Sequence, residues 1–381
     1  MMSQTIEEMS PEIVIPKDLL PTDGRFGSGP SKVRPEAVAA LTEAAPSFLG
    51  TSHRHATVRA LVGRLRGGLR DLFSLPDGYE VVLGVGGTTI FWDAAVAGLI
   101  ERKSQHLVFG EFSGKFAAAV QAAPFLSSPE IVSSDPGTHP VPHASEDVDL
   151  YALTHNETST GVAMAVARPA PEAFTAVDAT SAAGGMQVSP DDFDVYYFAP
   201  QKGFASDGGL WIALCSPAAV DRIERVAADD DRYIPPSLDL SIALENSRKD
   251  QTYNTPALAT IFLMVQSLEW MLANGGLEWS AGRCARSADI LYTWADASAV
   301  AEPFVKEPSE RSPVVGTIDF STELDAARIA AVLRANGILD TEPYRKLGRN
   351  QLRVAMYPAI EPDDIAQLTR SIDYVVAALR S

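Results

Sequence analysis

Residues 80–102 read EVVLGVGGTTIFWDAAVAGLIER, and this stretch decides the fold class. Residues 80–85 form a short, mostly apolar run that is typical of a buried strand. A pair of glycines follows, and the chain from residue 89 onward has the length and apolar content of a packed helix. A strand that passes through a glycine turn into a helix is the repeating unit of α/β proteins with a parallel sheet.

The same alternation continues along the chain. Further apolar runs predict strands at residues 106–111, 149–156, 174–180, 194–200 and 209–216. Strands that are apolar throughout are typical of a sheet whose two faces are both covered by helices. We therefore predict an α/β fold with a mainly parallel sheet.

The pattern also predicts how the chain divides. We expect an irregular N-terminal arm at residues 1–25 and a large domain at residues 26–275. A long helix should follow Thr255, with Thr255 as its N-cap and Pro256 at its first position. Residues 276–381 predict a smaller α+β domain. Its strands and helices are expected at residues 313–320, 350–356, 325–337 and 363–380.

Charge and composition exclude several classes of partner. The 381 residues carry a formal net charge of −18, which would repel nucleic acid and anionic membrane surfaces, so neither is expected as a partner. The 2 cysteines lack metal-ligand spacing, and no metal is expected. The acidic N-terminus and the lack of a membrane-length apolar run predict a cytoplasmic protein.

Four features follow predicted strands, at the edge where open α/β sheets bind ligands. Asp178 ends one strand, Lys202 follows a later one, and Phe112 follows the strand at 106–111. The glycine turn at 84–89 can offer backbone N–H groups to an anion. Each feature alone also has an ordinary structural explanation. Together they supply the amine, carboxylate, flat ring and anion site that pyridoxal phosphate chemistry needs.

The chain resembles the phosphoserine aminotransferase family of fold-type-I, class V enzymes. The resemblance rests on motifs in the family's order: FGSGPSKV (26–33), TSHRH (51–55), GVGGTT (84–89), HNETSTG (155–161), VDATSAAGG (177–185), APQKGF (199–204), YNTP (253–256) and YRKLGRNQLRVAMY (344–357). It implies a fold-type-I sheet of the seven-stranded type, pyridoxal 5'-phosphate as cofactor, and a homodimer with shared active sites.

The resemblance also implies roles for cofactor-binding residues. Lys202 would be the catalytic residue, linking covalently to the cofactor aldehyde and then moving the substrate proton. Asp178 would pair with the ring nitrogen, Phe112 would stack on the ring, and Thr158 would bond the ring oxygen. The cofactor phosphate would be held by Gly87, Thr88, Thr180 and Gln201 and, across the dimer interface, by Asn254 and Thr255.

The reaction implied is amino transfer between L-glutamate and 3-phosphohydroxypyruvate, giving 2-oxoglutarate and O-phospho-L-serine. His53 and Arg54 would bind the substrate phosphate or side-chain carboxylate across the interface, assisted by Arg345. Arg353 would form a bidentate pair with the α-carboxylate. Two alternatives stay open: another class V transaminase that uses glyoxylate or pyruvate, and a non-catalytic protein with the same fold. A cysteine desulfurase is disfavoured, because neither Cys215 nor Cys284 lies in an exposed glycine-rich loop.

Three positions depart from the family pattern. Phe112 stands where tryptophan is common, Tyr344 where many members have histidine, and Thr88 where many have arginine. The cofactor prediction is unaffected because Lys202 and Asp178 are both present. Tyr344 bears on substrate choice, since it adjoins the expected phosphate site.

Overall fold

The large domain is built on a mainly parallel sheet. The structure is a computed structural model that describes residues 13–380. Within these residues the sheet has seven strands in the order β1-β9-β8-β7-β4-β2-β3, and β9 runs antiparallel to both neighbours. The strands are β1 (Glu80–Gly86), β2 (Ser104–Val108), β3 (Glu130–Ser133), β4 (Leu150–Thr154), β7 (Thr175–Asp178), β8 (Val195–Phe198) and β9 (Gly209–Cys215). The predicted fold class is confirmed.

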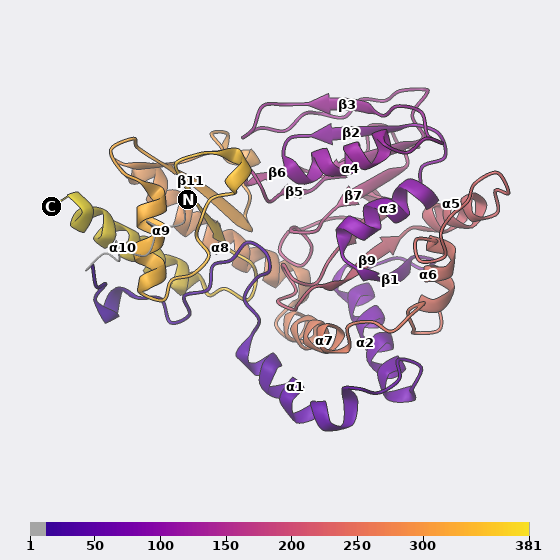
Figure 1. Cartoon of the computed structure of the whole chain (residues 1–381), viewed down its shortest axis with the longest axis horizontal. Helices are drawn as coiled ribbons and strands as arrows, with labels where there is room; N and C mark the ends of the chain where they lie inside the picture. Colours follow the sequence, from indigo (N-terminus) through magenta and orange to yellow (C-terminus); the bar gives the residue numbers. More distant parts are fainter. Residues whose placement is uncertain (1–12, 381) are drawn as a thin grey trace, which may run out of the picture.

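Helices cover both faces of this sheet (Figure 1). One face carries α3 (Thr88–Gly98), α4 (Glu111–Gln121), α5 (Pro217–Ala227) and α6 (Leu240–Ser247), and the other carries α2 (Ala56–Leu72) and α7 (Leu258–Ala273). Val82 packs into the first of these cores, whereas Val81 and Leu83 pack into the second. The strands read as continuous apolar runs because successive side chains enter different cores.

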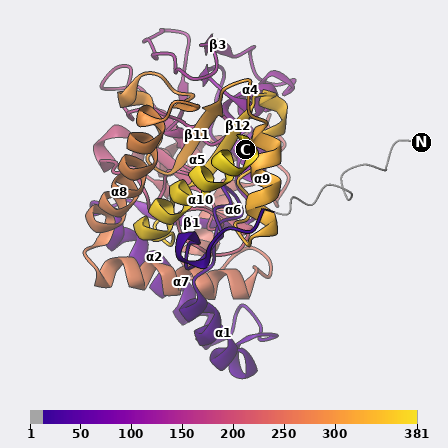
Figure 2. The same cartoon turned by 90° about the vertical axis from the view of Figure 1, so that its left-hand side faces the viewer.

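A smaller α+β domain lies beside the sheet in Figure 1 and faces the viewer in Figure 2. Its antiparallel strands are β10 (Ala301–Pro303), β11 (Val315–Phe320) and β12 (Gln351–Ala355). Its helices are α8 (Gly276–Ala297), α9 (Ala326–Ala335) and α10 (Pro362–Arg380). The remaining elements are α1 (Pro35–Phe48), the ribbon β5 (Asn156–Glu157) and β6 (Val162–Ala163), and the 3-10 helices η1 (Lys17–Leu19), η2 (Pro190–Asp192), η3 (Pro308–Glu310) and η4 (Arg345–Leu347).

The N-terminal strap, residues 13–30, packs on the small domain, and residues 1–12 of the predicted arm lie outside the described residues. Ile15 and Phe26 belong to the small-domain core. The Ala355 N–H donates to the Phe26 carbonyl at 3.0 Å, which ties the strap to β12. Leu277 and Trp279 pack against the large-domain core, whereas the buried side chains of α8 from Cys284 onward pack into the small-domain core. We propose that the domain boundary falls within the first turns of α8.

Two local predictions differ from the structure. Helix α7 begins at Leu258 with Ala257 as its N-cap, so the prediction that Thr255 caps it is wrong. The Thr255 hydroxyl instead bonds His53 Nδ1 at 3.2 Å. Strand β3 was missed because its residues alternate between half-buried and exposed, and so form no apolar run. Among the described residues, none of the helices has the length and apolarity needed to cross a membrane.

Candidate active site

A cavity of about 330 Å³ lies at the carboxyl ends of the parallel strands. The first turns of α3 and α4 contribute Thr88 and Phe112 to its lining, β7 contributes Asp178, and the loop after β8 contributes Lys202. Parallel strands end at one edge of their sheet, so residues far apart in the sequence meet here. The structure thus brings together the amine, the carboxylate, the ring and the anion site expected from the sequence.

Lys202 is a buried amine held by the N-terminal strap. Its Nζ donates to the Ser28 carbonyl at 2.6 Å, and the same carbonyl accepts from the Tyr357 hydroxyl at 2.9 Å. Burial lowers the pKa of Lys202 to about 8, and the positive charge of Arg353 acts in the same direction. A large fraction of the amine is therefore neutral near pH 8, which makes it a nucleophile and a base.

Gly29 explains how the strap can approach this amine. A Cβ atom at residue 29 would lie 1.9 Å from Lys202 Nζ. Its φ of +151° is also one that L side chains rarely adopt. The strap and the amine can therefore meet only because residue 29 has no side chain.

Asp178 is a buried carboxylate with three hydrogen-bond donors. Trp92 Nε1 donates to it at 3.1 Å, the Thr180 backbone N–H at 2.9 Å and the Thr180 hydroxyl at 2.6 Å. Burial raises the pKa of Asp178, and these donors oppose that rise. Thr180 is predicted to bind the cofactor phosphate, but in the structure its hydroxyl donates a hydrogen bond to Asp178. Sequence reasoning missed Trp92, whose only signal is an indole N–H on a buried helix face, where it needs an acceptor.

The start of α3 forms the anion end of the cavity. Gly87 is the N-cap, Thr88 is the first helical residue, and a Cβ added at Gly87 would meet nothing within 4 Å. The first N–H groups of a helix lack intrahelical partners and favour an anion such as phosphate. Gln201 also lines the cavity, and its buried Oε1 has no hydrogen-bond partner among the described residues.

Phe112 and Thr158 also line the cavity. The Phe112 ring lies 6.0 Å from the Tyr344 ring, measured between centroids. The Thr158 hydroxyl donates to Ser181 Oγ at 2.8 Å, and the Asn156 side-chain amide donates to the same oxygen at 2.8 Å. Ser181 and Asn156 were not predicted as site residues, because serine and asparagine in turns are usually explained by local capping.

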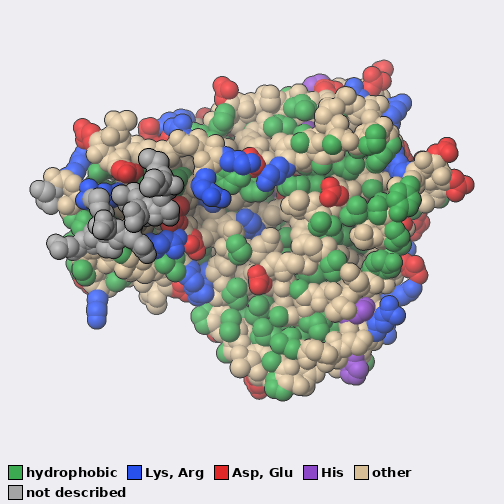
Figure 3. Space-filling view, in the orientation of Figure 1, with side chains coloured by type: hydrophobic (Ala, Val, Ile, Leu, Met, Phe, Trp, Pro, Cys, Tyr) green, Lys and Arg blue, Asp and Glu red, His purple; other side chains and the backbone are tan. Residues whose placement is uncertain are grey.

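The two substrate arginines differ in their surroundings. Arg353, on β12, donates to the Thr158 carbonyl at 3.3 Å and lies 5.4 Å from the Tyr344 ring centroid. Burial lowers the pKa of Arg353, and no carboxylate pairs with it within residues 13–380. Arg345, in η4, is exposed. Lys and Arg side chains gather where the two domains meet on the face in Figure 3. A mostly buried guanidinium without a carboxylate partner is suited to bind one from a ligand.

Seven predicted residues are absent from the lining of this cavity in the same chain. Gly87 directly precedes the lining residue Thr88, Arg353 contacts the Thr158 carbonyl, and Arg345 is exposed. The other four lie at two other cavities. His53, Arg54 and Thr255 line a separate cavity of about 630 Å³. Asn254 lines a third, of about 30 Å³. All four were expected to act across a dimer interface, and that role stays a prediction.

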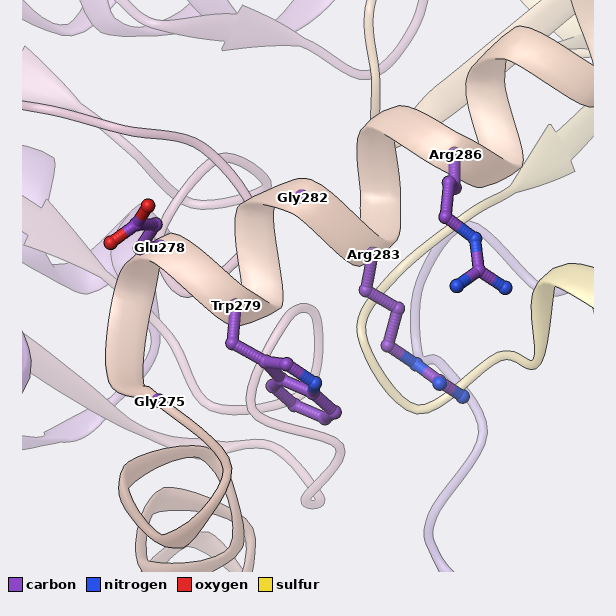
Figure 4. Close-up of a pocket in the computed structure, with 6 residues that line it drawn as sticks. All are labelled: Gly275, Glu278, Trp279, Gly282, Arg283 and Arg286. Atoms are coloured by element: carbon purple, nitrogen blue, oxygen red, sulfur yellow. The ribbon is translucent and has the colours of Figure 1, made fainter.

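A further cavity lies along α8 (Figure 4). Trp279 and Arg283 point to the same side of the helix there, and Glu278 points away. Arg283 donates to the Pro358 carbonyl at 2.7 Å and pairs with Glu361 at 2.5 Å. Its guanidinium therefore already has partners within the chain.

Known proteins resemble this chain over nearly its whole length. The family model described as Aminotransferase class-V matches residues 26–341. A phosphoserine aminotransferase of Nocardioides sp. is 59% identical over 372 residues, which is 97% of this chain and 99% of that protein. A phosphoserine aminotransferase of Rhodococcus jostii is 59% identical over 368 residues, which is 96% of this chain and 98% of that protein.

Solved structures show the same fold. A phosphoserine aminotransferase from Cytophaga hutchinsonii matches with a TM-score of 0.82 at 24% identity, covering 91% of this chain and 97% of that one. A pyridoxamine-pyruvate aminotransferase from Mesorhizobium loti matches with a TM-score of 0.80 at 19% identity, covering 97% and 95%. Proteins named for different substrates align almost equally well, so the likeness in fold does not decide the substrate.

Proposed function

The chain belongs to the class V aminotransferase family, and from this premise we propose that it transfers an amino group between L-glutamate and 3-phosphohydroxypyruvate. The products are O-phospho-L-serine and 2-oxoglutarate, a step of serine biosynthesis. The observation that carries the proposal is the 59% identity, over 97% of the chain, to a protein named phosphoserine aminotransferase.

Pyridoxal 5'-phosphate fits the cavity that Lys202 and Asp178 share. When bound, it supplies a conjugated ring that stores the electrons released at the substrate α-carbon. Lys202 would hold its aldehyde and Asp178 would face its ring nitrogen. The N-terminus of α3 would receive its phosphate, and Gln201 Oε1 and Asn156 Oδ1, which have no hydrogen-bond partner among the described residues, would be polar partners for its remaining atoms.

The chain's own residues orient the substrate and move its proton. Arg353 binds the α-carboxylate, because its guanidinium is mostly buried and unpaired and so gains most from a bidentate partner. Lys202 Nζ would take the proton from the substrate α-carbon and hold it as an ammonium group until it is transferred back. A pKa of about 8 suits this task, since proton transfer is efficient when the base titrates near the working pH.

A homodimer completes the site in this proposal. His53 and Arg54 lie outside the Lys202 cavity of their own chain, so they serve the site of a second copy. With Arg345 they bind the phosphate of 3-phosphohydroxypyruvate. The protein has a formal net charge of −18, so a dianionic substrate needs such a local cluster of cations to approach.

The nearest second candidate is a class V transaminase for unphosphorylated keto acids. Tyr344 favours it, because a phenol replaces the histidine expected beside the phosphate and lies over the Arg353 guanidinium. Rates with 3-phosphohydroxypyruvate and with hydroxypyruvate separate the two functions.

We expect kcat/KM to be roughly 100-fold higher for the phosphorylated acid, since charge-assisted hydrogen bonds to phosphate are lost without it. Equal values would contradict the proposal. The Lys202→Ala variant gives the background rate for both acids, and it should show no turnover with either.

A further inference from the structure

Helix α4, which carries Phe112 in its first turn, has no N-cap side chain of its own. Its N-cap is Gly110. An N-cap side chain normally accepts the free N–H groups of the first turn, and losing one destabilises the helix end. These N–H groups must therefore find an acceptor elsewhere in the chain.

Glu157, on β5, supplies that acceptor from another part of the sequence. Its Oε2 accepts from the Phe112 N–H at 3.1 Å, the Ser113 N–H at 2.9 Å and the Ser113 hydroxyl at 3.0 Å. Its Oε1 accepts from the Ser159 N–H at 3.2 Å and the Ser159 hydroxyl at 2.7 Å. The Ser159 oxygen in turn accepts from the Glu111 N–H at 3.0 Å. A single carboxylate thus joins β5 to the start of α4.

The arrangement is specific for a carboxylate. Glu157 is fully buried, and backbone N–H groups face both of its oxygens. An amide at this position would direct its NH₂ group against one of those N–H donors in either orientation. Gly110 also has to be glycine here, because a Cβ would lie 2.3 Å from Glu157 Cγ. Negative charge at the N-terminus of α4 is favoured by the helix dipole.

We propose that Glu157 is a positioning residue that fixes the Phe112 ring against the cofactor. Phe112 lines the cavity and donates its backbone N–H to Glu157, and Thr158, which follows Glu157 in the chain, lines the same cavity. The carboxylate therefore sets the distance between two lining residues without touching the cavity itself. This inference rests on the proposed pyridoxal phosphate function.

The test compares cofactor binding by Glu157→Gln, Phe112→Ala and the double variant. Pyridoxal phosphate is titrated into each apoprotein, and its visible absorbance and circular dichroism are recorded. We expect Glu157→Gln to bind about tenfold more weakly, because an unpaired buried donor is left in its place. Its circular dichroism per bound cofactor should also change, since the ring is less firmly oriented.

The double variant separates positioning from a general loss of stability. If Glu157 acts through Phe112, its replacement should add little in the Phe112→Ala background, so the double variant should bind about as weakly as either single one. Additive losses would overturn the proposal. Failure of the wild-type protein to bind the cofactor would instead overturn the proposed function.

Asp149→Asn is the matched control. Asp149 also accepts backbone N–H groups, from Glu101, Arg102 and Lys103 at 3.0, 2.8 and 2.7 Å, but it precedes β4 at the opposite edge of the sheet. The Asp149→Asn substitution should lower the melting temperature and leave the cofactor affinity and the circular dichroism of the bound cofactor unchanged. A Glu157→Gln variant that behaves in the same way would contradict the inference.

Ser159→Ala keeps the proposal testable if Glu157→Gln does not fold. It removes the hydroxyl that donates to Glu157 and accepts the Glu111 N–H, and it leaves the Phe112 and Ser113 bonds in place. We expect about threefold weaker binding, as for the loss of one neutral donor, and again no further loss in the Phe112→Ala background. Unchanged affinity and circular dichroism in this variant would count against the proposal.

Discussion

Lys202 and Asp178 could be predicted from sequence, but their partners could not. Each stands after an apolar strand, and strand ends in an α/β sheet meet at one edge. Ser28, which binds Lys202, lies 174 positions away from it, and Trp92, which binds Asp178, lies 86 positions away. No local pattern marks such a contact, because it exists only once the sheet and the strap have been assembled.

The pKa of Lys202 can be tested through the pH dependence of cofactor uptake. Only the neutral amine attacks an aldehyde, so uptake by the apoprotein should rise with pH and level off above about 8. Stopped-flow absorbance measures the rate. A midpoint near 10.5, the ordinary value for lysine, would show that burial does not depress this pKa.

Trp92→Phe tests the hydrogen bond to Asp178. The change removes an N–H donor to a buried carboxylate, and kcat should fall roughly tenfold with little change in fold. Trp294→Phe is the control, because Trp294 makes the same kind of bond to Asp373 at 2.9 Å outside the site. If the two variants were equally active, Trp92 would contribute to packing alone, and its hydrogen bond to Asp178 would have no role in catalysis.

At the scale of elements, strands buried on both faces were the most predictable. Strand β8 is buried at every position and reads as one apolar run, whereas β3 is half exposed and was missed. The start of α7 was misplaced because Thr255 and Pro256 form a typical helix start, while the Thr255 side chain has a tertiary partner in His53. Long-range contacts outweighed local propensity there.

Strand β12 places Arg353 against the carbonyl of the lining residue Thr158, and Arg353→Lys tests its role. Lysine keeps the charge but loses the bidentate fork, so the KM for L-glutamate should rise about tenfold or more with a smaller change in kcat. Arg349→Lys is the matched control, because Arg349 pairs with Asp319 instead. A comparable rise in KM for both variants would remove Arg353 from the substrate site.

The N-terminal strap is tested by Gly29→Ala. The new Cβ would displace the Lys202 amine, so cofactor uptake should slow about tenfold, while the strained φ costs some stability. Gly337→Ala carries a similar backbone strain, with φ at +84°, but meets no atom within 4 Å. We expect a lower melting temperature for both variants and slower uptake for Gly29→Ala alone. A Gly29→Ala variant that takes up the cofactor at the wild-type rate would contradict the close approach of residue 29 to the Lys202 amine.

At the scale of the whole molecule, the proposed function requires a dimer. Lys202 and Arg54 line different cavities of one chain, so an active site that needs both must combine two copies. Sequence analysis could predict this only through the family resemblance, since composition and periodicity say nothing of how two copies meet. The formal charge of −18 likewise indicates which partners are repelled, and not where the cations gather.

Mixing two inactive variants tests the shared site. Lys202→Ala and Arg54→Ala each lack one half, but a mixed dimer contains one site with both wild-type residues. Unfolding and refolding the two together should restore roughly a quarter of wild-type turnover, as random pairing predicts. Each variant refolded alone is the control. Mixed dimers without activity would place Lys202 and Arg54 in separate functions.

The most direct test of the central claim is the absorbance of the cofactor-loaded protein before and after addition of O-phospho-L-serine. The amino group should pass to the cofactor, so the visible band of bound pyridoxal phosphate should disappear as 3-phosphohydroxypyruvate is released. Unphosphorylated L-serine at the same concentration should leave the band nearly intact. A band that persists with O-phospho-L-serine, or that responds equally to both amino acids, would contradict the account.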